Sequence, residues 1–260
     1  LQARYRLACE LAKAGAELAF EYYQQRDRLT VDHKGEDLQD VVSVADKRVE
    51  AFVKQRITDA FPQDGFLGEE SGTQMPDARV LWVVDPIDGT RAFIDGQEGF
   101  SHSLAIATRD RITAAAVYLP AKDLLYTAHA DGPALLNGKP ISVSPRSEMR
   151  GATVLTYRAA TEPQHWAGGK VPDFRREFRP SLAWRLCLVA EGRFDAALSL
   201  RPCWEWDVAA ASLIAAPLMA EDRNALPLAL NGAWRQGGYA FGRTAPRALI
   251  FVDGEALATA

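Results

Sequence analysis

Two aspartates, Asp85 and Asp88, stand at the end of a predicted buried strand in the stretch V-L-W-V-V-D-P-I-D-G-T (80–90). The five apolar residues at 80–84 form a continuous run, with the length and β-branched content of a strand covered on both faces. Pro86 cannot donate to a sheet ladder, so we expect the chain to leave the sheet where the two aspartates lie. Both carboxylates are then held on rigid backbone, where they can bind metal cations.

The residues that follow the aspartates suit an oxyanion. Gly89 tolerates backbone angles closed to other residues, and residues 90–94 can begin a helix whose free N–H groups point back toward the carboxylates, as phosphate-binding sites require. Acids that hold cations beside donors that hold an oxyanion indicate metal-assisted phosphate chemistry. In isolation, the D-G-T tripeptide is equally well explained as a turn and a helix N-cap. An EF-hand loop counted from Asp85 is excluded, because its twelfth residue must be Glu and Gly96 stands there.

Further acids lie elsewhere in the chain, and each also has an ordinary structural explanation. Asp46 falls at or just before the first turn of a predicted helix, where an acid complements the helix dipole. Glu69 and Glu70 lie between a short apolar run and a glycine-rich loop, and adjacent acids are usually a solvated pair. Their closeness in sequence to the buried strand makes convergence on its aspartates geometrically easy. Asp207 is expected at the N-cap of a helix over 208–216.

The acids must be positioned by the elements that the apolar pattern predicts. Apolar residues recur at helical spacing over 7–22 and over 49–60, which predicts two amphipathic helices, the first of about six turns. Between residues 100 and 143, short apolar runs alternate with turn residues such as Asn137-Gly138, a spacing typical of an antiparallel meander. We therefore expect residues 1–150 to form an N-terminal α+β half, with two helices against an antiparallel-rich sheet and most of the acids.

The remaining residues, 151–260, alternate between helical and strand patterns and predict a smaller C-terminal α/β half that carries Asp207. A helix is expected over 181–191 and a strand over 194–200, while the polar stretch 159–180 is expected to be a loop. The fold class predicted for the whole chain is mixed α/β.

Composition and charge narrow the classes of function. The 260 residues are 48% hydrophobic and 25% charged, as in a globular protein with a large core. The formal net charge of −4 gives no broad basic face, so no nucleic-acid polymer is expected as a partner. The longest largely apolar run, 208–220, is too short to span a bilayer, so no membrane is expected either. The three cysteines (Cys9, Cys187 and Cys203) lack metal-ligand spacing and are expected to be reduced, which favours a cytoplasmic location.

Three motifs together carry a family resemblance, namely G-E-E-S at 68–71, D-P-I-D-G-T at 85–90 and W-D-V-A-A-A at 206–211. In this order they resemble the inositol monophosphatase-like superfamily of magnesium-dependent, lithium-sensitive phosphomonoesterases. The segments V-S-V-A-D-K at 42–47 and C-L-V-A-E-G at 187–192 also match, so the resemblance covers nearly the whole chain. The fold that it implies is an αβαβα layered sandwich, usually a homodimer.

The resemblance also implies roles for individual residues. Four carboxylates and one carbonyl would hold two or three Mg²⁺ ions, namely those of Glu69, Asp85, Asp88 and Asp207 and the backbone carbonyl of Ile87. A water activated by the ions would be the nucleophile, deprotonated with help from Glu69 and from a Thr90 hydroxyl paired with Asp46. Substrate and phosphate would contact Asp88, Gly89, Thr90, Ser181, Leu182, Ala183 and Asp207. The chemistry agrees, because Mg²⁺ prefers oxygen ligands and paired ions can clamp both the attacking and the leaving oxygen.

The substrate within this family is the most open question. Members that act on inositol phosphates carry a Glu that binds ring hydroxyls at the position of Leu200, and a leucine cannot accept a hydroxyl proton. E-W-D at 205–207 resembles the branch that removes the 3′-phosphate from adenosine 3′,5′-bisphosphate, and D-G-T-R-A-F-I at 88–94 is close to that branch and to histidinol-phosphate phosphatases. We expect a small phosphorylated metabolite, adenosine 3′,5′-bisphosphate first, with inositol 1-phosphate and histidinol phosphate as alternatives. A non-catalytic regulator that binds metal or phosphometabolites is the alternative of another class, but it is expected to have lost an acid of the metal set.

Overall fold

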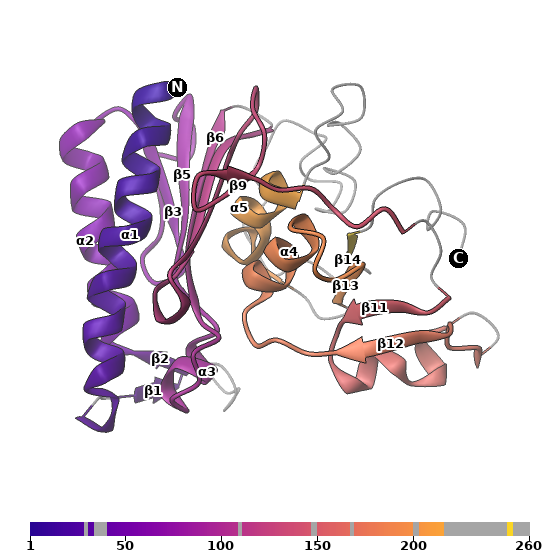
Figure 1. Ribbon diagram of the computed structural model, residues 1–260. Helices are drawn as coiled ribbons and strands as arrows, with labels where there is room; N and C mark the ends of the chain where they lie inside the picture. Colours follow the sequence, from indigo (N-terminus) through magenta and orange to yellow (C-terminus); the bar gives the residue numbers. More distant parts are fainter. Residues whose placement is uncertain are drawn as a thin grey trace.

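The computed structural model arranges the chain in alternating layers of helices and sheets (Figure 1). The structure describes the residues in the ranges 1–28, 31–33, 41–108, 111–146, 150–166, 169–199, 203–215 and 249–251. Leu200, the position of the missing inositol-binding acid, lies outside the described residues. The layers run from a helix pair through a large sheet, a second helix pair and a small sheet to short helical turns, which confirms the predicted αβαβα fold.

The first layer consists of the two predicted amphipathic helices, α1 (Gln2–Gln24) and α2 (Val44–Ala60). Helix α1 buries mostly small residues at helical spacing, which lets it lie close to the sheet. Helix α2 begins at a capping box, in which the Ser43 side chain caps the first turn and Asp46 accepts hydrogen bonds from the Ser43 backbone and hydroxyl. Asp46 therefore lies in the first turn of this helix, where its place in the sequence had put it.

The second layer is an eight-stranded sheet with the order β10-β9-β8-β7-β6-β5-β3-β4. Its strands are β3 (Gly65–Gly68), β4 (Gly72–Gln74), β5 (Val80–Asp88), β6 (Ser101–Thr108), β7 (Arg111–Leu119), β8 (Leu124–His129), β9 (Leu135–Leu136) and β10 (Lys139–Pro140). All neighbouring strands are antiparallel except β3 and β5, which run parallel. The predicted meander is confirmed, and the parallel pair brings the carboxyl ends of two strands to one edge of the sheet.

Strand β5 continues past Pro86 through a bulge and ends at Asp88, the second of the two aspartates where the chain was expected to leave the sheet. Asp85 pairs with Ser103 and Asp88 with Ser101, so β5 carries one more residue than β6 between these pairs. Residues three apart in a regular strand point to opposite faces, whereas the extra residue brings both aspartates to the same face. A proline is tolerated at such a bulge because no ladder hydrogen bond is required there.

The remaining elements build the other layers. A four-stranded sheet has the order β12-β11-β13-β14, with β11 at Ala152–Leu155, β12 at Phe174–Glu177, β13 at Ala196–Ser199 and β14 at Leu249–Phe251. Helices α4 (Leu182–Ala190) and α5 (Glu205–Ala215) lie between the two sheets (Figure 1). Short elements complete the described chain, namely α3 (Thr90–Ile94), β1 (Val31–His33), β2 (Val41–Ser43) and the 3₁₀ turns η1 (Arg26–Arg28), η2 (Pro120–Lys122), η3 (Arg158–Thr161) and η4 (Pro163–His165).

The second half contains more regular structure than its polar sequence indicated. The stretch 159–180, expected to be a loop, contributes strand β12, whose residues are almost all exposed. An edge strand exposed on both faces carries no alternating apolar pattern, and the prediction of a loop there was wrong for that reason.

The division into halves at residue 150 stays a prediction. The two parts pack closely, because α5 of the second half lies on β5, β6 and β7 of the first. One cluster of buried residues includes side chains from both halves, among them Leu81, Val117, Leu186 and Ala210. No helix in the described part of the chain has the length and apolar character needed to cross a membrane.

Candidate active site

The carboxyl ends of β3 and β5 bring the first two acids together. The backbone N–H of Glu69 donates to the carbonyl of Val84 at 3.3 Å, which extends the parallel pairing one residue beyond β3. Glu69 therefore lies beside Asp85, close enough for its carboxylate to raise the pKa of Asp85 further above the effect of burial. This contact follows directly from parallel pairing, because parallel strands end at the same edge.

Asp207 reaches the same place from helix α5. The helix begins at Glu205, so Asp207 lies inside its first turn and not at the N-cap, as the sequence had indicated. Its carboxylate accepts a hydrogen bond of 2.7 Å from the Trp204 backbone N–H, which is the return contact of a capping box. Glu205 and Trp206 are helical residues before the acid, so the helix start was placed three residues too late.

The electrostatics show that these acids are close neighbours. Burial raises the pKa of Asp85 well above its usual value, and the charges of Glu69, Asp88 and Asp207 raise it further. Burial likewise raises the pKa of Asp207, with added repulsion from Glu69 and Asp88. Four carboxylates from three separate segments of the chain therefore converge, and their repulsion is relieved only by protons or by cations.

The fourth acid, Asp88, is also held by the start of helix α4. Its carboxylate accepts hydrogen bonds from the Ser181 hydroxyl, from the Leu182 N–H at 3.2 Å and from the Ala183 N–H at 2.7 Å. Burial raises the Asp88 pKa, whereas these hydrogen bonds oppose the rise. The structure thus brings the three predicted substrate contacts of α4 to the acids, with their donors directed at Asp88. Their contact with substrate stays a prediction.

The chemistry of the acids fits a hard divalent cation. All available donors are oxygens, and the buried Oδ1 of Asp85 has no hydrogen-bond partner in the described part of the chain. Within those residues, no three His, Cys, Asp or Glu side chains are grouped so as to hold one ion as they stand. The contacts of Asp88 with α4 and of Asp207 with Trp204 account for this, because they turn carboxylate oxygens toward the protein.

The predicted pairing of Thr90 with Asp46 is present. The Thr90 hydroxyl lies 3.2 Å from Oδ1 of Asp46 and 3.0 Å from the carbonyl oxygen of Ile87. Gly89, which precedes it, has a φ of 93°, and this left-handed conformation favours glycine. Helix α2 therefore contacts the turn at the end of β5 through a buried carboxylate.

Two residues near the acids were not assigned from the sequence. Glu50, buried on α2, accepts the backbone N–H groups of Glu70 and Ser71. His102, buried on β6, contacts the Asp85 and Pro86 carbonyls through Nδ1, and burial lowers its pKa to about 4. An acid that interrupts the apolar stripe of α2 was a usable signal for Glu50, whereas no sequence signal identified the contacts of His102.

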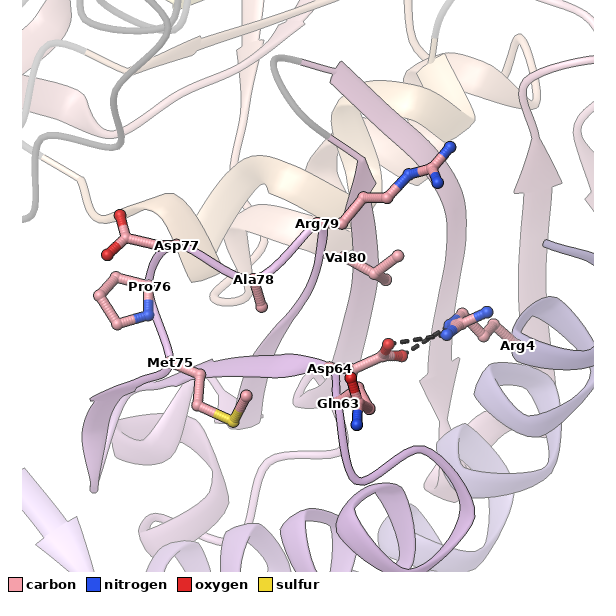
Figure 2. Close-up of a pocket in the computed structure, with 9 residues that line it drawn as sticks. All are labelled: Arg4, Gln63, Asp64, Met75, Pro76, Asp77, Ala78, Arg79 and Val80. Atoms are coloured by element: carbon pink, nitrogen blue, oxygen red, sulfur yellow. Dashed lines mark hydrogen bonds and ion pairs between the residues drawn. The ribbon is translucent and has the colours of Figure 1, made fainter.

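An open groove lies away from these acids, at the amino end of β5 (Figure 2). It has a volume of about 580 Å³ and is lined by Arg4, Gln63, Asp64, Met75, Pro76, Asp77, Ala78, Arg79 and Val80. Figure 2 shows that the buried acid of this region, Asp64, is bound by the guanidinium of Arg4. The groove therefore belongs to a different region from the converging carboxylates.

Comparison with known proteins decides the family. The inositol monophosphatase family matches residues 1–216. The chain belongs to this family. An inositol-1-monophosphatase of Rhizobium meliloti is 35% identical over 221 residues, which cover 80% of this chain and 77% of the relative. A histidinol-phosphatase of Chlorobaculum parvum is 31% identical over 208 residues, 78% of this chain and 79% of the relative. A Nus factor SuhB of Vibrio cholerae is 33% identical over 215 residues, 78% of each chain.

Solved structures of the inositol monophosphatase family share the fold. The extragenic suppressor protein SuhB of Bartonella henselae superposes with a TM-score of 0.72 at 28% identity, covering 82% of this chain and 83% of that one. A staphylococcal IMPase-I complexed with products also gives a TM-score of 0.72, at 25% identity, covering 83% and 81%. The chain is therefore a phosphoric monoester hydrolase of a generally metal-dependent family.

Proposed function

We propose that this protein hydrolyses a small phosphate monoester with the help of two or three Mg²⁺ ions. The single observation that carries the proposal is the cluster of Glu69, Asp85, Asp88 and Asp207. Burial raises the pKa values of the three aspartates, and repulsion from neighbouring acids adds to the rise at Asp85 and Asp207. Like charges brought together in the interior are costly unless a cation binds between them.

The ions would be held by the four carboxylates together with the carbonyl of Ile87. When bound, they supply positive charge that stabilises the developing charge on the phosphate oxygens and favours ionisation of a water. The carboxylates contribute by holding that charge in a buried site, where electrostatic interactions are stronger than in water. Among these carboxylates, Asp85 is the best supported as an ion ligand, because its Oδ1 has no hydrogen-bond partner within the described residues.

The chain's own contribution to proton transfer would come from Thr90, Asp46 and Glu69. The Thr90 hydroxyl can pass its proton to Oδ1 of Asp46, which lies 3.2 Å away, and accept one from an attacking water. Asp46 is fixed for this role, because its Oδ2 accepts two hydrogen bonds from Ser43. Glu69 would act on the same water from the other side of the cluster.

The substrate's phosphate would bind at the turn formed by Asp88, Gly89 and Thr90. The N–H groups of Gly89 and Thr90 would donate to phosphate oxygens, and the leaving group would face Ser181, Leu182, Ala183 and Asp207. This placement is supported by the hydrogen bonds that tie the turn after β5 to α4, since they put both groups of residues at one site.

For the substrate we propose a phosphate monoester with a flat ring, adenosine 3′,5′-bisphosphate first and histidinol phosphate second. Support comes from Trp204 and Trp206, which stack with ring centroids 4.9 Å apart and planes 12° apart, beside Asp207. Trp206 is 9% exposed and serves the core, while the half-buried Trp204 leaves a ring surface to stack on. Inositol 1-phosphate has no aromatic ring and would gain nothing from this surface.

The test is turnover of a panel of phosphate monoesters by the purified protein at saturating Mg²⁺. We expect kcat/KM to be highest for adenosine 3′,5′-bisphosphate, lower for histidinol phosphate and lowest for inositol 1-phosphate. Trp204→Ala should lower kcat/KM for the two aromatic substrates alone, and so bring their values closer to that for inositol 1-phosphate. Trp166→Ala, which removes an aromatic contact with Phe174 elsewhere in the chain, is the control. A preference of about tenfold or more for inositol 1-phosphate would contradict the substrate assignment.

Further properties accompany this function. Lithium inhibition and a homodimer are proposed from the family resemblance, and a cytoplasmic location from the free cysteines. The negative net charge supports a small metabolite over a nucleic-acid polymer as the partner. Lithium titration of the Mg²⁺-dependent activity and light scattering of the purified protein test the first two.

A further inference from the structure

Glu50 makes a two-pronged contact with the turn that carries Glu69. Its Oε2 accepts the Glu70 N–H and its Oε1 accepts the Ser71 N–H, each at 2.7 Å. The side chain comes from the middle of α2 and is 1% exposed. Short, charge-assisted hydrogen bonds to two successive N–H groups fix both the position and the orientation of the turn.

The surroundings of Glu50 are shaped for this contact. A Cβ atom on Gly68 would lie 2.5 Å from both Cδ and Oε2 of Glu50, so only glycine lets the carboxylate reach the turn. The Ser71 hydroxyl accepts a hydrogen bond of 3.0 Å from Nζ of Lys54, one helical turn beyond Glu50. On the other side, the Glu69 N–H is bound to the Val84 carbonyl of β5. Glu69 is thus held between the sheet and α2.

Glu50 also stands one helical turn after Asp46, on the same buried face of α2. Asp46 contacts the Thr90 hydroxyl in the turn after β5, while Glu50 binds the turn after β3. One helix therefore holds, through two buried carboxylates, both turns that present the candidate site.

We propose that Glu50 is a positioning residue that holds Glu69 for cation binding. The proposal rests on the proposed function, because it assigns Glu69 a place in the metal site. Glu50 itself would touch neither metal nor substrate. It acts through the backbone of Glu70 and Ser71, and partners of this kind typically contribute about 10- to 100-fold to metal affinity.

The first experiment measures Mn²⁺ binding to the metal-free protein by calorimetry. Glu50→Gln keeps the size but replaces one acceptor oxygen with an amino group that faces an N–H donor. Glu50→Asp keeps the charge but cannot reach both N–H groups. Both variants should bind Mn²⁺ about tenfold or more weakly. KM for the phosphate substrate at saturating metal should stay close to that of the wild type. Glu10→Gln, an exposed acid on α1, is the matched control and should change neither value.

The two variants separate position from charge. Weak Mn²⁺ binding by Glu50→Gln together with wild-type binding by Glu50→Asp would show an effect of charge alone and would overturn the proposal. Wild-type binding by both folded variants would also overturn it. A general loss of stability would lower the midpoint of thermal unfolding without shifting the Mn²⁺ affinity of the folded protein, and this result counts against positioning as well.

A second measurement uses the wild-type protein and does not depend on the variants folding. Hydrogen exchange of the Glu70 and Ser71 amides should be slow in the metal-free protein, because Glu50 already binds both. Exchange at the rate of an open loop would overturn the proposal. Wild-type protein that binds no Mn²⁺ and hydrolyses no phosphate monoester would contradict the proposed function instead, and slow exchange would then still establish the contact of Glu50 with the turn.

Discussion

The two ends of the parallel pair β3 and β5 each carry buried acids, but the acids are treated in opposite ways. At the amino end, Asp64 precedes β3 and its side chain is 3% exposed. Nε and Nη2 of Arg4 bind its two carboxylate oxygens at 2.6 and 2.7 Å, and the Trp82 indole N–H adds a third bond at 2.9 Å. Every oxygen has a donor, so this acid is part of the scaffold.

At the carboxyl end, Asp88 has donors from α4 on both oxygens, but Asp85 is stabilised incompletely. Asp85 is buried, its Oδ1 has no partner among the described residues, and its neighbours Glu69, Asp88 and Asp207 repel its charge. One sheet thus contains both an acid that serves the scaffold and an acid that we propose to bind a cation. All donors to Asp64 come from the protein, whereas Asp85 keeps an oxygen available and carries an electrostatic cost that a bound cation would remove.

The largest expected effect is on activity at the carboxyl end. Asp85→Asn should lower Mg²⁺-dependent turnover by several orders of magnitude, because it removes a charged ligand without changing the size of the side chain. The metal-free variant should be no less stable than the wild type, since repulsion within the cluster falls. Asp64→Asn is the matched control at the other end of the pair and should keep its turnover while losing stability. Near-normal turnover by Asp85→Asn would contradict the assignment of Asp85 to the metal site.

A smaller effect is expected from the Thr90 hydroxyl, which links the turn after β5 to helix α2. Thr90→Ala should lower kcat by about a hundredfold, because the residue is proposed to move a proton and not to hold a cation. Calorimetric titration with Mn²⁺ should give an affinity close to that of the wild type. Thr58→Ala, at an exposed position on α2, provides the control. A collapse of Mn²⁺ affinity in Thr90→Ala would instead place the hydroxyl among the metal-binding groups.

The amino end should respond in stability alone. Arg4→Ala leaves the Asp64 carboxylate buried without its ion-pair partner, and we expect a loss of about 2 kcal/mol in the free energy of unfolding. This figure lies below that for a fully buried pair because Arg4 is 26% exposed. Urea unfolding measures the loss, with Arg6→Ala, an exposed arginine on the same helix, for comparison. Activity per folded molecule should not change, and a large fall in kcat/KM would mean that the two ends are coupled.

The smallest effect is the pH dependence of the metal-free protein. The pKa of Asp85 is raised on folding, so between its folded pKa and its ordinary value of 3.8 the folded state binds more protons than the unfolded state. The contribution of Asp85 should therefore destabilise the protein at neutral pH and fade as the pH falls toward 3.8. The difference in unfolding free energy between Asp85→Asn and wild type isolates it, and this difference should shrink on acidification.

The buried His102 changes the unfolding free energy with pH in the opposite direction to Asp85, and its contribution must cancel between Asp85→Asn and wild type. Burial lowers the pKa of His102 from 6.5 to about 4, so stability from this residue is lost as the pH falls through that interval. Because the histidine is present in both proteins, it affects both curves alike. A difference that grows on acidification would contradict the raised pKa of Asp85.

The sequence by itself determined the elements whose signal is local. The helical spacing before Tyr22 and the short runs after Phe100 record which backbone faces apolar surroundings, and α1 and the meander follow from them. The D-P-I-D-G-T motif marked the end of a buried strand, and together with G-E-E-S and W-D-V-A-A-A it indicated the family. These patterns need no knowledge of what lies across the fold, because each depends on neighbours a few residues away.

Only the tertiary structure decided how the acids are aimed and held. Asp85 and Asp88 share a face because of a bulge that appears only when β5 is paired with β6. Asp88 meets the start of α4, and Glu50 meets the turn after Glu69, across separations of 93 to 95 and of 20 to 21 residues. Whether a carboxylate finds a donor at such a distance depends on which faces of helix and sheet are brought together. That pairing of faces separates the compensated Asp64 at one end of β3 and β5 from the uncompensated Asp85 at the other.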